Sequence, residues 1–175
     1  DFVVPVGTEV VPAAPGRVLR ISREFHRGGL KVFVDHGDGL VTSYNHLARA
    51  RCRVGDVVRR GRTFALSGYS GLDGLATFPF GVPHVHFNVW LDGAYVDPFS
   101  AGPDSPSLWN AGNAPVPFAG SDDDASAEPI PDAGWDEAAV EAAIRACRSP
   151  ESRGDIERAR GFEERAMAAL FHLAY

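Results

Sequence analysis

The sequence predicts a mostly β, compact antiparallel domain over residues 1–99, followed by a linker and a small helical tail. Between Gly16 and Pro98, short apolar runs are broken by Gly and Asp, which is typical of short strands joined by tight turns. Residues 100–134 are rich in Pro, Gly, Ser, Ala and Asp and carry too little apolar surface to fold alone. Residues 135–175 return to an apolar spacing that favours helices.

Five apolar runs in the first region are predicted strands, over Arg17 to Ser22, Leu30 to His36, Leu40 to His46, Thr63 to Ser67 and His84 to Leu91. The triplet Gly37-Asp38-Gly39 separates the second run from the third. Because these residue types tolerate positive φ, we expect residues 30–46 to form a hairpin.

The tail is predicted to form two helices, separated by Pro150 and Gly154. Their apolar faces comprise Val140, Ala143, Ile144 and Cys147 in the first, and Ile156, Ala159, Phe162, Ala166 and Leu170 in the second. Two interpretations stay open: the pair packs on the rest of the protein, or it binds a protein partner.

Charge and composition exclude several classes of protein. The net charge of -6 argues against a nucleic-acid partner, because phosphate backbones are held by clustered Lys and Arg. No run approaches the roughly 18 apolar residues that a membrane span needs. Cys52 and Cys147 are too few for a disulfide framework. The sequence starts at Asp1 rather than Met and at once enters patterned structure, so we expect it to be cut from a longer protein.

His84 and His86 are the first candidates for chemistry. On a strand, residues two apart share a face and lie roughly 6.6 Å apart along it, so both imidazoles would point into one site. Val85 and Phe87 would point into apolar packing and hold the pair on a stiff element. A lone His-x-His pair is more often a solvated strand face, and further motifs must support it.

Three motifs together resemble the lysostaphin and LytM type of zinc metallopeptidase, whose signature is His-x-x-x-Asp, then Tyr-x-His-Leu, then His-x-His-Phe. The matching segments are Asp1-Phe2-Val3-Val4-Pro5-Val6-Gly7-Thr8, Tyr44-Asn45-His46-Leu47 and His84-Val85-His86-Phe87. The resemblance implies that Asp1 and His86 are zinc ligands, and that His46 and His84 are catalytic without binding the metal. The family's first histidine would lie four residues before Asp1, so we expect this chain alone to bind zinc weakly.

The chemistry of that family explains these residue types. Zinc held by three protein ligands keeps a fourth position for water and lowers its pKa to about 7. One neutral imidazole can take the proton of that water while a second donates to the oxyanion, and His46 and His84 fit these roles in either order. Tyr44 either adds a donor near the oxyanion or packs in the core. His36 is expected to be structural, and residues 68–81 to form one wall of the groove.

The resemblance further implies hydrolysis of peptide bonds in the stems or cross-bridges of bacterial peptidoglycan, in the cell envelope or outside the cell. One alternative is an inactive relative that binds or activates a cell-wall amidase. A biotinyl or lipoyl carrier domain would need a lysine at a hairpin tip, whereas Lys31 lies inside a predicted strand. A cupin-type metal site would need a later histidine near the pair, and the next one is His172 in the tail.

Overall fold

A computed structural model of the chain describes residues 1–25, 27–76, 81–91, 93–98, 137–146, 150–160 and 165. The predicted linker over residues 100–134 lies outside these ranges, as do His26, Cys147 and His172. The domain boundaries drawn from the sequence therefore stay predictions.

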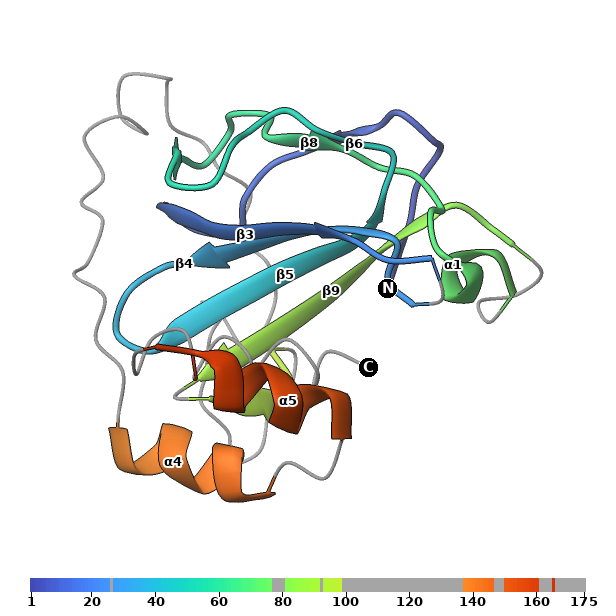
Figure 1. Cartoon of the computed structure of the whole chain (residues 1–175). Helices are drawn as coiled ribbons and strands as arrows, with labels where there is room; N and C mark the ends of the chain where they lie inside the picture. The colour runs from blue at the N-terminus through green and yellow to red at the C-terminus, as the bar shows by residue number, and fades with distance from the viewer. Residues whose placement is uncertain are drawn as a thin grey trace.

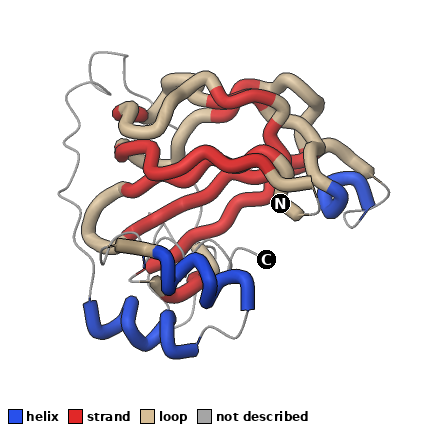
Figure 2. Tube along the Cα trace, viewed as in Figure 1, coloured by secondary structure: helices blue, strands red, loops and turns tan. Residues whose placement is uncertain are grey.

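Two antiparallel sheets make up the N-terminal region and confirm the predicted mostly β fold (Figures 1 and 2). The large sheet has the order β1-β9-β5-β4-β3-β7, with β10 also paired to β9, and the small sheet has the order β2-β8-β6. Large-sheet strands are β1 (Phe2–Val3), β3 (Gly16–Arg23), β4 (Leu30–Asp35), β5 (Leu40–Leu47), β7 (Val57–Val58), β9 (His84–Leu91) and β10 (Ala94–Val96). Small-sheet strands are β2 (Glu9–Val10), β6 (Arg49–Ala50) and β8 (Ala65–Leu66).

The predicted hairpin over residues 30–46 is formed by β4 and β5, which pair antiparallel. Gly37, Asp38 and Gly39 all adopt positive φ, at 81°, 50° and 73°. The backbone N–H of Gly37 donates to the carboxylate of Asp35 at 2.8 Å and fastens the turn. Residues that accept left-handed backbone thus reverse the chain, as the sequence indicates.

The two faces of the large sheet differ in chemistry. One face packs against the small sheet and forms the core, which includes Val18, Val32, Val34, Tyr44, Val85 and, from the small-sheet side, Phe64 and Ala65. Strand alternation sends the intervening residues to the other side, which we call the outer face. By register it carries Arg20, Lys31, Phe33, Ser43, Asn45, His86, Asn88 and Trp90. Polar and titratable groups therefore gather on the outer face.

The first predicted tail helix is present as α4 (Glu137–Ala146). A second helix, α5 (Pro150–Arg158), covers the stretch from Pro150 to Gly154 that was expected to separate the pair, so this part of the prediction is wrong. Proline is well accommodated at the first helical position, and Pro150 begins α5 there. Of the predicted second helix, Phe162, Ala166 and Leu170 lie outside the described residues. Both helices lie on the opposite side of the large sheet from the small sheet, with α4 against β10 (Figure 1). Among the described residues, no helix is both long and apolar enough to cross a membrane.

Candidate metal and catalytic site

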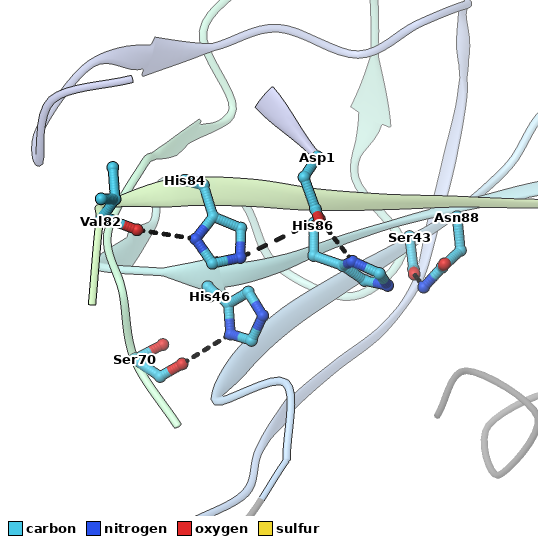
Figure 3. A network of polar contacts seen from close by, with 8 residues as sticks. All are labelled: Asp1, Ser43, His46, Ser70, Val82, His84, His86 and Asn88. Atoms are coloured by element: carbon cyan, nitrogen blue, oxygen red, sulfur yellow. Dashed lines mark hydrogen bonds and ion pairs between the residues drawn. The ribbon is translucent and has the colours of Figure 1, made fainter. Parts of the chain in front are cut away.

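Pairing between β1 and β9 brings the two ends of the domain sequence together. Val3 lies opposite His84 and Phe2 opposite Val85, so Asp1 falls beside His86. The Asp1 carboxylate Oδ1 is 2.6 Å from Nδ1 of His86 and 4.0 Å from Nε2 of His84 (Figure 3). Three of the predicted site residues therefore meet at one point of the outer face.

His46 joins this group through an irregularity in β5. Tyr44 faces the core, and regular alternation would send His46 the same way. Instead, the register between β4 and β5 shifts next to His46, and His46 adopts a φ of 59°. A bulge of this kind re-aims a side chain. The His46 ring consequently reaches the outer face, with its centroid 4.7 Å from that of His84 and 5.9 Å from that of His86.

Backbone carbonyls fix how the two predicted catalytic histidines are protonated. Nδ1 of His46 lies 2.9 Å from the Ser70 carbonyl, and Nδ1 of His84 lies 2.8 Å from the Val82 carbonyl (Figure 3). A carbonyl only accepts, so each Nδ1 carries the hydrogen and each Nε2 of the neutral ring keeps a lone pair. Both rings can therefore accept a proton at Nε2.

Burial favours the neutral form of two histidines in the cluster, His46 and His86. It lowers the pKa of His46 to about 4, an effect that the neighbouring imidazoles reinforce and the Ser70 carbonyl opposes. Burial also lowers the pKa of His86. His46 is thus neutral at pH 7, and a neutral ring suits both metal binding and proton acceptance.

Asp1 and His86 fit a zinc ion in donor chemistry. Carboxylate oxygen and imidazole nitrogen are both common zinc ligands, and here Oδ1 and Nδ1 converge within 2.6 Å. The side chain of Asn88 lies beside the His86 ring and raises its pKa as a hydrogen-bonding group, against the larger effect of burial, while Nδ1 faces Asp1. No group of three or more His, Cys, Asp or Glu side chains placed to hold a metal occurs within the described ranges. The residues present therefore supply two donors of such a site.

Sequence reasoning missed the polar residues beneath this cluster. Asn88 is buried and its amide donates to Ser43 Oγ at 3.4 Å (Figure 3). Asn45 pairs with His86 in the β5–β9 register and is fully buried, and its amide atoms have no hydrogen-bond partner among the described residues. Strand alternation could have indicated Asn88 from the sequence, because Asn88 lies two residues after His86 and therefore on the same face of the strand.

The other aromatic candidates lie away from the cluster. Tyr44, the weak substrate-binding candidate, is not brought to the site, because alternation turns it into the core against Phe64 and Phe87. Its hydroxyl accepts a hydrogen bond from the Ala13 backbone N–H at 2.6 Å. His36 is buried, with Nδ1 on the Pro15 carbonyl and Nε2 on the Thr42 hydroxyl, in agreement with a structural role.

Residues 68–81, the segment expected to form one wall of the groove, contact the His46 ring through their backbone. Ser70 holds the His46 ring by its carbonyl, and the helix α1 (Leu72–Ala76) follows directly. A Cβ at Gly74 would lie 2.7 Å from Nδ1 of His46, so α1 touches the ring through a glycine. Tyr69, Leu72 and Leu75 are exposed in this segment, whereas Phe78 and Phe80 are outside the described residues.

Comparison with known proteins identifies the family. Residues 1–98, more than half of the chain, match the model of Peptidase family M23, and the chain belongs to this family. The expected kinship with lysostaphin-type metallopeptidases is thereby confirmed.

Three curated relatives are similar over the same region. A metalloprotease of Haemophilus influenzae described as uncharacterized is 31% identical over 100 residues, which cover 57% of this chain and 20% of that protein. Peptidoglycan DD-endopeptidase ShyB of Vibrio cholerae is 31% identical over 102 residues (58% and 22%), and lysostaphin of Staphylococcus staphylolyticus 31% over 88 residues (50% and 17%). The chain thus spans about a fifth of the length of these relatives.

Among solved structures, a zinc containing peptidase from Vibrio cholerae is 28% identical, with a TM-score of 0.49. The match covers 59% of this chain and 29% of that one.

Proposed function

We propose that the chain is the catalytic domain of a zinc-dependent endopeptidase that hydrolyses peptide bonds in the stems or cross-bridges of bacterial peptidoglycan. The observation that carries the proposal is the bulge at His46, which turns this ring out of the core and into the group formed by Asp1, His84 and His86. Relatives named as peptidoglycan or glycyl-glycine endopeptidases support the substrate class. Such a substrate places the protein in the cell envelope or outside the cell.

In this proposal, Asp1 Oδ1 and His86 Nδ1 hold the metal. A third ligand comes from a histidine four residues before Asp1 in the complete protein, as the family signature implies. Zinc supplies a Lewis acid that activates water and polarises the scissile carbonyl. Asn88 keeps the His86 ring turned so that Nδ1 faces Asp1.

His46 and His84 handle protons in this proposal. Each is anchored by an Nδ1–H to a backbone carbonyl, so Nε2 is the atom of each neutral ring that can accept a proton. The neutral His46 ring can accept a proton from the attacking water. An imidazole that has gained a proton can then donate to the developing oxyanion or the leaving amine. Two rings 4.7 Å apart thus provide acceptor and donor together.

The test measures zinc content by elemental analysis and cleavage of purified peptidoglycan by mass spectrometry. It uses this chain and a protein extended upstream by about ten residues. We expect about one zinc and new peptide products only in the extended protein, because three ligands bind zinc far better than two. If the extended protein neither binds zinc nor cleaves, the alternative of a metal-free module that binds a cell-wall amidase replaces this proposal.

The roles within the site are tested with His46→Ala in the extended protein. Removal of a general acid or base lowers the rate by about 10²–10⁴-fold, and the zinc content should not change. His86→Ala is the matched variant and should lose the metal. Loss of zinc in His46→Ala would show that His46 is a ligand.

A further inference from the structure

Ser70 is bound to the neighbourhood of His46 through each of its polar groups. Its backbone carbonyl faces Nδ1 of His46 at 2.9 Å (Figure 3), and its backbone N–H donates to the His46 carbonyl at 3.3 Å. Its hydroxyl donates to the Leu47 carbonyl at 2.7 Å and accepts from the Leu30 N–H at 2.9 Å. This single residue, just before α1, therefore contacts both the His46 ring and the two strands that form the bulge.

The Ser70 hydroxyl acts at the point where the pairing of β4 with β5 is irregular. Between the pairs Leu30–Leu47 and Val32–Tyr44, β5 contains one residue more than β4. Such an extra residue interrupts the ladder, and the backbone groups beside it need other partners. The hydroxyl bridges the N–H and the carbonyl of the Leu30–Leu47 pair, at the end of the irregularity. Ser70 thereby fastens the bulge that turns the His46 ring out of the core.

Glycines allow the segment around Ser70 to lie directly against these strands. A Cβ at Gly29 would collide with Ser70, and a Cβ at Gly68 would lie 2.8 Å from the His46 carbonyl oxygen. Backbones approach this closely only where a side chain is absent. A displacement of Ser70 is therefore passed on to the backbone and the ring of His46.

The carbonyl contact decides which ring nitrogen of His46 is available. A neutral imidazole carries one hydrogen, on either Nδ1 or Nε2. The Ser70 carbonyl requires this hydrogen on Nδ1, and Nε2 then keeps the lone pair that accepts a proton. A ring that lost the contact could carry its hydrogen on Nε2 instead and would no longer accept a proton there.

We propose that Ser70 is a positioning residue for His46: its hydroxyl maintains the bulge in β5, and its carbonyl fixes the direction and the Nδ1–H tautomer of the ring. The effect on the rate rests on the proposed function, whereas the effect on the tautomer does not. The rate of hydrolysis thus depends on a hydroxyl group that takes no part in the reaction itself.

Ser70→Ala and Ser70→Thr test the hydroxyl in the complete protein. Alanine removes both hydroxyl contacts. Threonine keeps the hydroxyl, and Ser70 lines a cavity of about 470 Å³ with room for a further methyl group. Ser70→Cys is a second test of the loss, because a thiol is a weak donor and a weak acceptor. Ser67→Ala is the matched control, since Ser67 is buried in the same segment and its hydroxyl donates to the Pro5 carbonyl at 2.7 Å.

The tautomer of His46 is read from the ¹⁵N chemical shifts of its ring, which are assigned by their absence in His46→Ala. Rates are measured on soluble peptidoglycan fragments, with zinc content as a check on the metal ligands. We expect Ser70→Ala to populate the Nε2–H tautomer and to lower kcat about tenfold, less than the roughly 10²-fold cost of a displacement of about 1 Å. Ser70→Cys should change both quantities in the same direction. KM and zinc content should stay unchanged, and Ser70→Thr and Ser67→Ala should behave like the wild type.

The inference is overturned if the tautomer or kcat is unchanged in both Ser70→Ala and Ser70→Cys. It is also overturned by an equal loss in Ser70→Thr, which would exclude the hydroxyl, or in Ser67→Ala, which would indicate a general loosening of the segment. Absence of cleavage by the wild-type protein is a different result, because it overturns the proposed function. The tautomer alone then decides whether Ser70 positions the His46 ring.

Discussion

The strands β9 and β5 present their histidines in different ways. His84 and His86 follow from the regular alternation of β9, whose neighbours β1 and β5 hold it on both sides. His46 depends on a bulge in β5, a left-handed backbone conformation and a hydrogen bond from its N–H to the Gly28 carbonyl at 2.7 Å. A non-glycine residue in this conformation is strained, and the surrounding structure has to maintain it.

The difference indicates which part of the site is most easily disturbed. A conservative change near β9 leaves the alternation intact, and with it the direction of both rings. A change near His46 acts on a ring held by three local features, namely Gly28, Ser70 and the close approach of Gly74. Perturbation of α1 should therefore affect catalysis without affecting metal binding.

The largest expected effect is that of Gly74→Ala. The added Cβ would lie 2.7 Å from Nδ1 of His46, so the ring must shift and its bond to the Ser70 carbonyl weakens. A displacement of about 1 Å at a catalytic group costs about 10²-fold in rate. We expect this loss in kcat for soluble peptidoglycan fragments, with the zinc content unchanged.

Gly154→Ala is the control for that substitution, because its Cβ would meet only the flexible Arg158 side chain. It should raise helix stability by roughly 0.5–1 kcal/mol and leave the rate as it is. An unchanged rate in Gly74→Ala would mean that the His46 ring tolerates displacement and is not the proton acceptor.

The direction of His84 and His86 on the regular strand β9 can be predicted from the sequence. The direction of His46, which depends on a bulge in β5, cannot. Alternation in His84-Val85-His86-Phe87 predicts the shared face of the two histidines, and the glycines around Asp38 predict the β4–β5 hairpin. Both are local consequences of backbone geometry. Alternation alone would send His46 into the core with Tyr44, and only the family resemblance placed His46 in the site.

Contacts between distant segments also escaped the sequence. The helical spacing of the tail predicts α4, but it does not indicate that α4 lies against β10, on the side of the large sheet opposite the small sheet (Figure 1). The buried row of Ser43 and Asn88 depends likewise on strand register. Periodicity indicates that an element has an apolar face without indicating what covers it.

A second prediction concerns the stability of the fold in acid, which depends on the buried histidines His46 and His36. His46 and His36 are both buried, and burial lowers the pKa of each to about 4, against 6.5 for the free side chain. Since the native state binds fewer protons than the unfolded chain in this interval, stability is full above pH 6.5 and is lost as the pH falls toward 4. At pH 5 each histidine should cost about 2 kcal/mol.

The measurement is urea unfolding of the metal-free chain between pH 4 and 8, for the wild type and His36→Asn. The variant should lose about half of the pH dependence in this window, and the remainder belongs chiefly to His46. If the two proteins have the same slope, His36 is not buried in its neutral form.

The smallest effect is expected beneath β9, where His86, the proposed metal ligand, is supported by the side chain of Asn88. Removal of a group that orients a metal ligand typically weakens metal affinity by 10–100-fold. The contact from Asn88 to Ser43 is long, at 3.4 Å, so Asn88 is itself held loosely. We therefore expect Asn88→Ala to weaken zinc binding by about tenfold, at the lower end of that range, as measured by competition with a chelator in the extended protein.

Ser43→Ala is the control and should change the zinc affinity less, because the His86 ring keeps Asn88 beside it. An equal loss in both variants would mean that the whole row, rather than Asn88, holds His86 in place. No loss in either would show that the alternation of β9 alone directs Nδ1 of His86 toward Asp1. The orientation of His86 would then need no supporting side chain, in contrast to that of His46 on β5.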